Sequence, residues 1–142
     1  MITALVAGAF DCIHPGYIAM FKFAKKHCDR LIVAVHEDPS IENPEKPKPV
    51  LSISERMEIL LALRYVDEVA PYTSEVGLLY LLETLRPDLR VLGDDYKHKP
   101  ITGADLCLIL WHQRSTDWTS TRLKQAYADS LKGIHENSHN RR

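Results

Sequence analysis

The stretch ITALVAGAFDCIHPGY, residues 2–17, indicates the fold class. Its first part, Ile2 to Gly8, is a short and mostly apolar run that ends at glycine and predicts a β-strand. Pro15 and Gly16 then precede a segment whose apolar residues recur at helical spacing. Those residues are Tyr17, Met20, Phe21, Ala24 and Cys28. A strand, a turn and a helix in this order are typical of the first unit of a parallel sheet.

The same alternation continues along the chain. Further apolar runs predict strands at 30–36, 66–72, 89–93 and 106–112. Between them, we expect a helix over 55–65 capped by Ser54, a helix over 76–85 stopped by Pro87, and a last helix beginning near Thr119. The proline-rich segment 37–52 predicts a long loop of the kind that often carries function.

Strands that alternate with helices predict an α/β fold, with a Rossmann-like, mainly parallel five-stranded sheet and helices on both faces. We expect a single domain over residues 1–131, followed by a disordered tail over residues 132–142.

The composition excludes several classes of protein. A net charge of -1 does not favour nucleic acid or a membrane surface as a partner. No apolar stretch reaches the roughly 20 residues that span a bilayer, and the first residues lack a signal-peptide pattern. Cys12, Cys28 and Cys107 are odd in number and widely spaced, which predicts reduced thiols and a cytoplasmic location. Of the seven histidines, His135 and His139 lie in a polar tail and the others show no helical ligand spacing, so we expect no dedicated metal site.

Three residues near the end of the first strand predict a phosphate-binding turn. In parallel folds, ligands bind at the carboxyl ends of strands where the strand order reverses. Gly8 lets a ligand approach the backbone closely, and Gly16 lies beside the positive end of a helix dipole. His14 would donate to a phosphate oxygen, although histidines near a helix start often cap or pack instead.

Polar residues also follow the fourth and fifth predicted strands. Asp94 and Asp95 follow the fourth strand, and Arg114 comes shortly after the fifth. A hydroxyl cluster, 119–121, precedes the last helix. Taken singly, the acids are turn formers and the hydroxyls are helix caps. Because parallel strands end at the same edge of a sheet, their convergence favours a binding site.

These segments resemble a known family. GAFDCIHPGY, ERMEI, RYVDEV, GDDYK and WTSTRLK occur in the order seen in small cytidylyltransferases of the HxGH nucleotidyltransferase superfamily, with particular likeness to glycerol-3-phosphate cytidylyltransferase. The resemblance covers the chain up to about Lys124. DRLIVAV and DYKHKP also resemble the heptose-1-phosphate adenylyltransferase branch.

The resemblance implies transfer of CMP from CTP to a phosphorylated alcohol, such as glycerol 3-phosphate, with release of pyrophosphate. It also implies Mg²⁺ bound with the nucleotide, and a homodimer in which RYVDEV contributes to the interface. The alternatives are cytidylyl or adenylyl transfer, from CTP or ATP, to another acceptor such as heptose 1-phosphate, and a catalytically silent nucleotide-binding module.

The resemblance also implies roles for individual residues. The catalytic positions are His14, Tyr17, Lys46 and Arg114. The nucleotide-binding positions are Gly8, Ala9, Phe10, Gly16, Arg64, Asp67, Asp95, Trp118, Thr119, Ser120 and Thr121. The acceptor-binding positions are Asp11 and Lys48, but Asp11 would equally orient a backbone group, and the lysines would equally solubilise a loop tip.

Two of these positions depart from the family pattern. Ala9 stands where threonine is usual, and Tyr17 stands where the second histidine is usual. A tyrosine hydroxyl donates a hydrogen bond but carries no positive charge, which would cost about 1–2 kcal/mol. That corresponds to roughly 5- to 30-fold in rate if the loss is felt only in the transition state. We therefore expect a slower or retuned enzyme.

Overall fold

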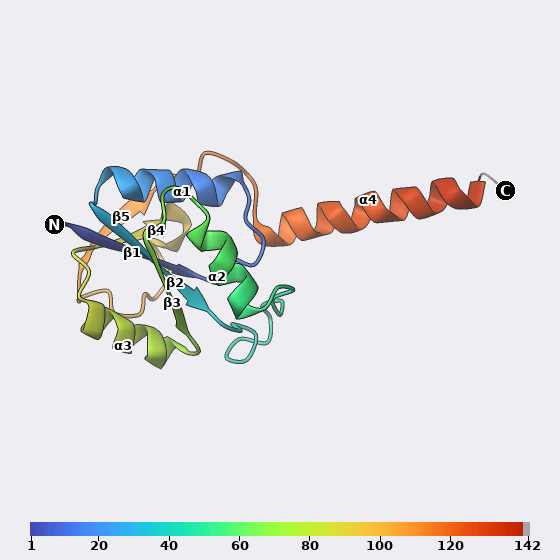
Figure 1. The fold of residues 1–142 in the computed structure, drawn as a ribbon. Coiled ribbons are helices and arrows are strands. Elements are labelled where there is room, and N and C mark those ends of the chain that lie inside the picture. Colours follow the sequence, from blue (N-terminus) through green and yellow to red (C-terminus); the bar gives the residue numbers. More distant parts are fainter. Residues whose placement is uncertain (141–142) are drawn as a thin grey trace.

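The computed structural model of the protein describes the backbone of residues 1–140 and the side chains of residues 1–134. Strands and helices alternate along this part of the chain, as the sequence predicts (Figure 1). The elements are β1 (Thr3–Gly8), α1 (Pro15–Lys26), β2 (Arg30–His36), α2 (Ile53–Leu61), β3 (Glu68–Tyr72), α3 (Glu75–Leu85), β4 (Leu89–Gly93), the 3₁₀ helix η1 (Asp94–Tyr96), β5 (Leu108–His112) and α4 (Ser120–Asn140).

The five strands form one sheet in the order β3-β2-β1-β4-β5, and every neighbouring pair is parallel. The chain first builds outward from β1 to β3 and then continues with β4 on the other side of β1. The strand order therefore reverses between β1 and β4, the place where open parallel sheets form a ligand crevice. The predicted α/β fold is confirmed.

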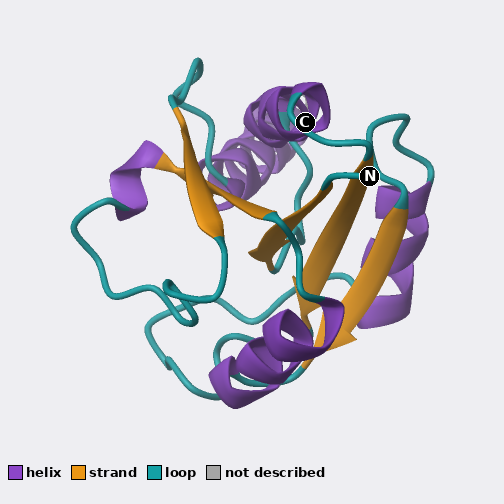
Figure 2. Cartoon of the chain, turned by 90° about the vertical axis from the view of Figure 1, so that its left-hand side faces the viewer, coloured by secondary structure: helices purple, strands orange, loops and turns teal. Residues whose placement is uncertain are grey.

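The strand side chains alternate between two cores. Ala4 and Val6 of β1 face the core beneath α1 and α2, whereas Leu5 faces the core beneath α3. The same alternation holds along β2, as the period of a strand requires. Figures 1 and 2 show helices on either side of the twisted sheet. Burial on both faces explains why the strands are almost continuously apolar in sequence.

The N-cap of α2 is Ser52, so the prediction of Ser54 is wrong. The Glu55 N–H donates to Ser52 Oγ at 3.1 Å, and the Ser52 N–H donates to the Glu55 carboxylate at 2.9 Å. This reciprocal capping box satisfies two N–H groups that the helix itself leaves unpaired. Ser54 is the second residue of the helix itself, two positions after the cap, so it cannot provide it.

Two strands begin later than predicted. β3 starts at Glu68 and β5 starts at Leu108, whereas the apolar runs suggested Val66 and Leu106. The Val66 N–H donates to the Leu63 carbonyl at 3.2 Å, in the turn that follows α2. Val66 is buried by that turn and not by strand pairing.

Helix α4 projects away from the body of the domain (Figure 1). It continues to Asn140, through most of residues 132–142, for which the sequence predicted a disordered tail. Residues 141 and 142 lie outside the described part. A helix can extend in this way because its backbone hydrogen bonds lie within the helix itself. No helix in the described chain is both long enough and apolar enough to cross a membrane.

Candidate active site

A cavity of about 680 Å³ lies at the carboxyl ends of β1 and β4, where the strand order reverses. Its walls come from the turn after β1, the start of α1, the long loop after β2, η1 and the start of α4. It is lined by fourteen of the residues expected at the site. They are Gly8, Ala9, Phe10, Asp11, His14, Gly16, Tyr17, Lys46, Asp95, Arg114, Trp118, Thr119, Ser120 and Thr121.

The turn after β1 is backbone-strained at Phe10. This buried residue has φ 49°, in the left-handed region that residues with a Cβ rarely occupy. The Phe10 ring packs against Tyr17 and Phe21, with centroid distances of 5.1 and 5.4 Å. A Cβ at Gly8 would lie 3.1 Å from the Phe10 ring, closer than most such contacts, so the ring would have to shift by a few tenths of an ångström. The aromatic packing thus holds the turn in its strained conformation.

His14 presents an unpaired donor to the cavity. Its Nδ1 accepts the Gly16 N–H at 3.1 Å and caps α1, which places the ring proton on Nε2. Nε2 is buried and has no hydrogen-bond partner in the described protein. Burial, and then the positive charge of Arg114, lower the pKa of His14 below its ordinary value. A neutral imidazole with its Nε2–H directed at the cavity is therefore the favoured form.

Gly16 is needed because His14 and Thr116 occupy the space around it. A Cβ there would lie 2.9 Å from His14 Cε1 and 3.1 Å from Thr116 Oγ1. The Gly16 N–H was expected to cradle phosphate, but it already donates to His14. Thr116 was not predicted as a site residue, yet its buried hydroxyl lines the cavity and is unpaired within the described protein. It is a second polar group available to a ligand.

The Tyr17 hydroxyl joins α1 to the start of α4. It lies 3.1 Å from Ser120 Oγ, and Ser120 Oγ in turn donates to the Cys12 carbonyl at 3.3 Å. Because the Ser120 hydroxyl uses its hydrogen on the Cys12 carbonyl, the Tyr17 hydroxyl is left as the donor to Ser120. Burial raises the pKa of Tyr17. The Tyr17 ring also stacks on His14, with centroids 4.1 Å apart. Tyr17 therefore positions two other cavity residues.

The amino end of α4 faces the cavity. Thr119 Oγ1 accepts the Arg122 N–H at 3.0 Å, so the helix-cap reading of Thr119 is the one that the structure shows. A helix start of this kind offers backbone N–H groups and a partial positive charge to an anion. Arg114 lies just before it on the cavity wall, and the Arg122 guanidinium covers the Trp118 ring at 4.6 Å.

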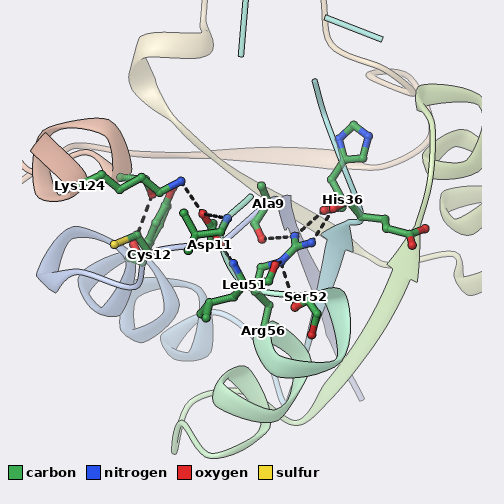
Figure 3. Close-up of polar contacts among 12 residues, drawn as sticks. Ala9, Asp11, Cys12, His36, Leu51, Ser52, Arg56 and Lys124 are labelled. Carbon is green, nitrogen blue, oxygen red and sulfur yellow. Dashed lines mark hydrogen bonds and ion pairs between the residues drawn. The ribbon is translucent and has the colours of Figure 1, made fainter. Parts of the chain in front are cut away.

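Asp11 anchors the far end of the loop at 37–52. Its two oxygens accept the Val50 and Leu51 N–H groups, both at 2.8 Å, and it is paired with Lys124 of α4 (Figure 3). Burial would raise its pKa, but the Lys124 and backbone hydrogen bonds outweigh burial and hold the pKa below its usual value. Of the two roles open to Asp11, the structure shows the orientation of backbone groups.

Arg56 is a structural residue of the site that the sequence reading did not single out. Its side chain is 2% exposed and donates to five backbone carbonyls (Figure 3). These belong to Ala9 after β1, His36 and Glu37 after β2, and Leu51 and Ser52 at the end of the loop. Burial lowers its pKa, and its nearest acids only partly oppose this. The signal in the sequence is an arginine on the apolar face of a helix, within ERMEI.

Comparison with known proteins assigns the family. A family model described as cytidylyltransferase-like matches residues 5–124. The chain belongs to the cytidylyltransferase-like family. The resemblance seen in the sequence is thereby confirmed at the level of the family.

Relatives with high identity are proteins named bifunctional protein HldE. The HldE of Gluconacetobacter diazotrophicus is 39% identical over 100 residues, which cover 70% of this chain and 20% of that protein. An HldE of Haemophilus influenzae is 40% identical over 98 residues, which cover 68% of this chain and 20% of that protein. This cytidylyltransferase-like chain thus spans about a fifth of the length of the curated relatives it matches.

Solved structures share the fold of this cytidylyltransferase-like domain. The lipopolysaccharide core biosynthesis protein of Thermoplasma volcanium superposes with a TM-score of 0.64 at 27% identity, covering 82% of this chain and 98% of that one. The pantoate-beta-alanine ligase of Francisella tularensis superposes with a TM-score of 0.62 at 18% identity, covering 87% of this chain and 65% of that one. At this identity the likeness shows the fold alone.

Three residues that the family resemblance suggested do not line the cavity. Asp67 precedes β3 at the amino edge of the sheet, where it pairs with Lys25 and accepts the Leu31 N–H at 2.8 Å. Arg64 is exposed in the turn before it, and Lys48 is exposed on the loop. Because parallel strands start at the edge opposite to their carboxyl ends, the folded single chain keeps Arg64 and Asp67 away from the cavity.

A magnesium ion of this cytidylyltransferase-like domain would have few protein ligands. Within the described residues, no group of three or more histidines, cysteines, aspartates or glutamates converges. Asp95 is a cavity carboxylate from η1, whereas both oxygens of Asp11 are already engaged. This donor set fits Mg²⁺, which keeps several waters and is often held by one carboxylate and the substrate phosphates.

Proposed function

We propose that this chain transfers a nucleotidyl group from a nucleoside triphosphate to the phosphate of a small phosphorylated acceptor, with release of pyrophosphate. The supporting observation is the buried, unpaired Nε2–H of His14, facing a cavity that also receives Arg114 and the amino end of α4. Membership of the cytidylyltransferase-like family supports the same reaction.

In the proposed reaction, an oxygen of the ionised acceptor phosphate attacks the α-phosphorus of the nucleotide. One P–O bond forms to the acceptor, the bond between the α-phosphorus and the bridging oxygen breaks, and pyrophosphate leaves with the bonding electrons. His14 Nε2–H donates to an α-phosphate oxygen and stabilises the charge that accumulates there. Because no protein group forms a covalent bond, the residues contribute position and charge.

The β- and γ-phosphates would be held by further groups that line the cavity. These are the amino end of α4, the Thr116 hydroxyl, Arg114, and Lys46 from the loop. Bound with the nucleotide, Mg²⁺ would neutralise part of the triphosphate charge, with Asp95 as its protein carboxylate. Tyr17 would act indirectly, through Ser120 and the His14 ring.

Two specific pairs of substrates follow from the similarities. RYVDEV favours CTP with a glycerol 3-phosphate-like acceptor. DRLIVAV and DYKHKP resemble the heptose-1-phosphate adenylyltransferase branch and favour ATP with heptose 1-phosphate. More observations favour the second pair.

The test is pyrophosphate release with Mg²⁺ and each combination of ATP or CTP with heptose 1-phosphate, a hexose 1-phosphate or glycerol 3-phosphate. Turnover with one pair, and a product of the corresponding mass, is expected. Nucleotide binding by calorimetry without turnover on any acceptor would instead support a silent nucleotide-binding module.

The matched variant is His14→Asn, because asparagine still caps a helix but lacks the imidazole donor. The expected loss in kcat is about 10²–10³-fold with folding retained, as for removal of a donor to a developing charge. An unchanged kcat would contradict the role of His14.

The homodimer implied by the family resemblance is also a proposal. Sedimentation equilibrium at working concentration should give about twice the chain mass of 16.2 kDa. A mass equal to that of one chain would refute it.

A further inference from the structure

The cavity extends across the sheet to the face covered by α3. We name this part the α3-side lobe and define it by His36, Tyr72, Glu75, Arg90 and Thr102, all of which line the cavity. Tyr72 belongs to the core beneath α3, and the register sets Arg90 opposite Leu5 of that same core. The lobe is thus on the other face of the sheet from the His14 ring and α1.

Two nitrogen atoms in the lobe, Arg90 Nε and His36 Nε2, are buried and have no hydrogen-bond partner within the described protein. Both residues are only 5% exposed. Arg90 uses one Nη1–H on the Thr102 carbonyl, and burial lowers its pKa. Leaving a buried donor unpaired is costly, so such groups in a cavity point to a ligand.

A network of polar contacts fixes the lobe in shape. Thr102 Oγ1 donates to the Glu75 carboxylate at 2.6 Å, and the Glu75 N–H donates to Glu42 Oε1 at 2.9 Å. Glu42 Oε1 also lies 3.8 Å from His36 Nε2. The His36 ring stacks on Tyr72 with centroids 4.7 Å apart. Two loop residues and the first residue of α3 therefore hold the lobe together.

The chemistry of the lobe suits a polyhydroxylated ligand. Guanidinium and imidazole N–H groups donate, and the carboxylate of Glu75 accepts, so the lobe can satisfy hydroxyl groups that do both. A nucleobase would place a flat ring against these charged groups and leave most of them unpaired. The phosphate-facing groups His14, Thr116 and α4 lie elsewhere in the cavity, which leaves the lobe for the other substrate.

We propose that the α3-side lobe binds the hydroxyl-bearing body of a sugar phosphate acceptor, and that Arg90 and His36 are its specificity-determining contacts. This inference rests on the proposed function and names the substrate class of the same site. A site built to hydrogen-bond a substrate hydroxyl strongly rejects an analogue that lacks it. The lobe should therefore favour a sugar phosphate over glycerol 3-phosphate.

The variants are Arg90→Met and His36→Asn, with Arg30→Met as a charge-matched control at the amino edge of the sheet. Circular dichroism and melting temperature first establish that each variant is folded. Calorimetry then measures binding of heptose 1-phosphate, glycerol 3-phosphate, and the α,β-methylene analogues of ATP and CTP, each to the full chain.

Arg90→Met should weaken heptose 1-phosphate binding by about 10-fold or more, the loss of one charge-assisted hydrogen bond. His36→Asn should weaken it in the same direction, while Arg30→Met leaves it unchanged. Nucleotide analogues and glycerol 3-phosphate should bind all the variants within about 2-fold of the wild type. In turnover, KM for the sugar phosphate should rise with KM for the nucleotide unchanged.

Three results would overturn the inference. One is a wild-type chain that does not bind heptose 1-phosphate. The second is an Arg90→Met chain that binds it normally. The third is a larger loss for the nucleotide analogues, which would place the nucleoside in the lobe. Failure of the proposed function is separate, because absence of pyrophosphate release alongside Arg90-dependent sugar phosphate binding would refute the reaction and support the lobe.

Discussion

Replacing Arg56 by methionine should destabilise the whole domain. Arg56 is 2% exposed and its three nitrogen atoms donate to five backbone carbonyls, from the turn after β1, the end of β2 and the end of the loop. Methionine fills much of the same volume but donates nothing. The carbonyls of Ala9, His36 and Glu37 would lose donors that now lie at 2.9, 2.7 and 2.5 Å.

The magnitude follows from the number of carbonyls left unpaired. If two of them stay buried without a donor, at about 1–3 kcal/mol each, the cost is about 2–6 kcal/mol. Removing the buried guanidinium charge offsets part of this cost. We expect a net loss of about 2–4 kcal/mol, against a total of about 5–15 kcal/mol for an ordinary domain.

Urea denaturation followed by circular dichroism measures this loss. Arg56→Lys should fall between wild type and Arg56→Met, because lysine keeps the charge but has three donors on one atom. The control is Arg30→Met, whose side chain is partly exposed and paired with Glu68, and should cost less than about 1 kcal/mol. A loss for Arg56→Met no greater than that of the control would refute the reasoning.

Three further predictions concern the cavity. Tyr17→Phe removes the hydrogen bond to Ser120, so the free energy of unfolding should fall by about 0.5–1.5 kcal/mol and turnover by no more than about 10-fold. Complete loss of activity would mean that the hydroxyl contacts a reacting phosphate. In the folded protein the pKa of His14 is lowered from 6.5, so as pH falls the unfolded chain binds the proton first. The wild type should therefore lose stability relative to His14→Asn below about pH 6.5. Stability curves from urea denaturation that stay parallel between about pH 5 and pH 8 would contradict the assignment of a neutral ring. Lys46 lines the cavity and Lys48 does not, so Lys46→Ala should raise KM for substrate several-fold more than Lys48→Ala, and equal effects in initial-rate assays would argue for a purely solubilising loop.

Much of this protein could be read from local patterns. The apolar runs and helical stripes gave the five strands, the four main helices and the parallel sheet, because alternation and helical spacing depend on neighbouring residues only. The carboxyl ends of parallel strands meet at one edge, so Gly8, Asp95 and Arg114 could be expected together. The Ser52 cap could also be predicted, because a serine three residues before a glutamate is the pattern of a capping box.

The partners of the polar groups depended on the tertiary structure. Tyr17 and Ser120 are 103 residues apart, and only the packing of α1 against the start of α4 makes the hydroxyl a tether. Arg56 reads as an ordinary helical arginine until the turn after β1 and the end of β2 bring their carbonyls to it.

The sequence by itself determined the fold and the edge of the sheet that carries the cavity, because these follow from periodicity and strand direction. Its motifs carried the resemblance to the family. Only the tertiary structure decided which groups remain unpaired in that cavity. His14 Nε2, Arg90 Nε and His36 Nε2 lack a hydrogen-bond partner among the described residues, and a missing partner is a property of the folded surroundings.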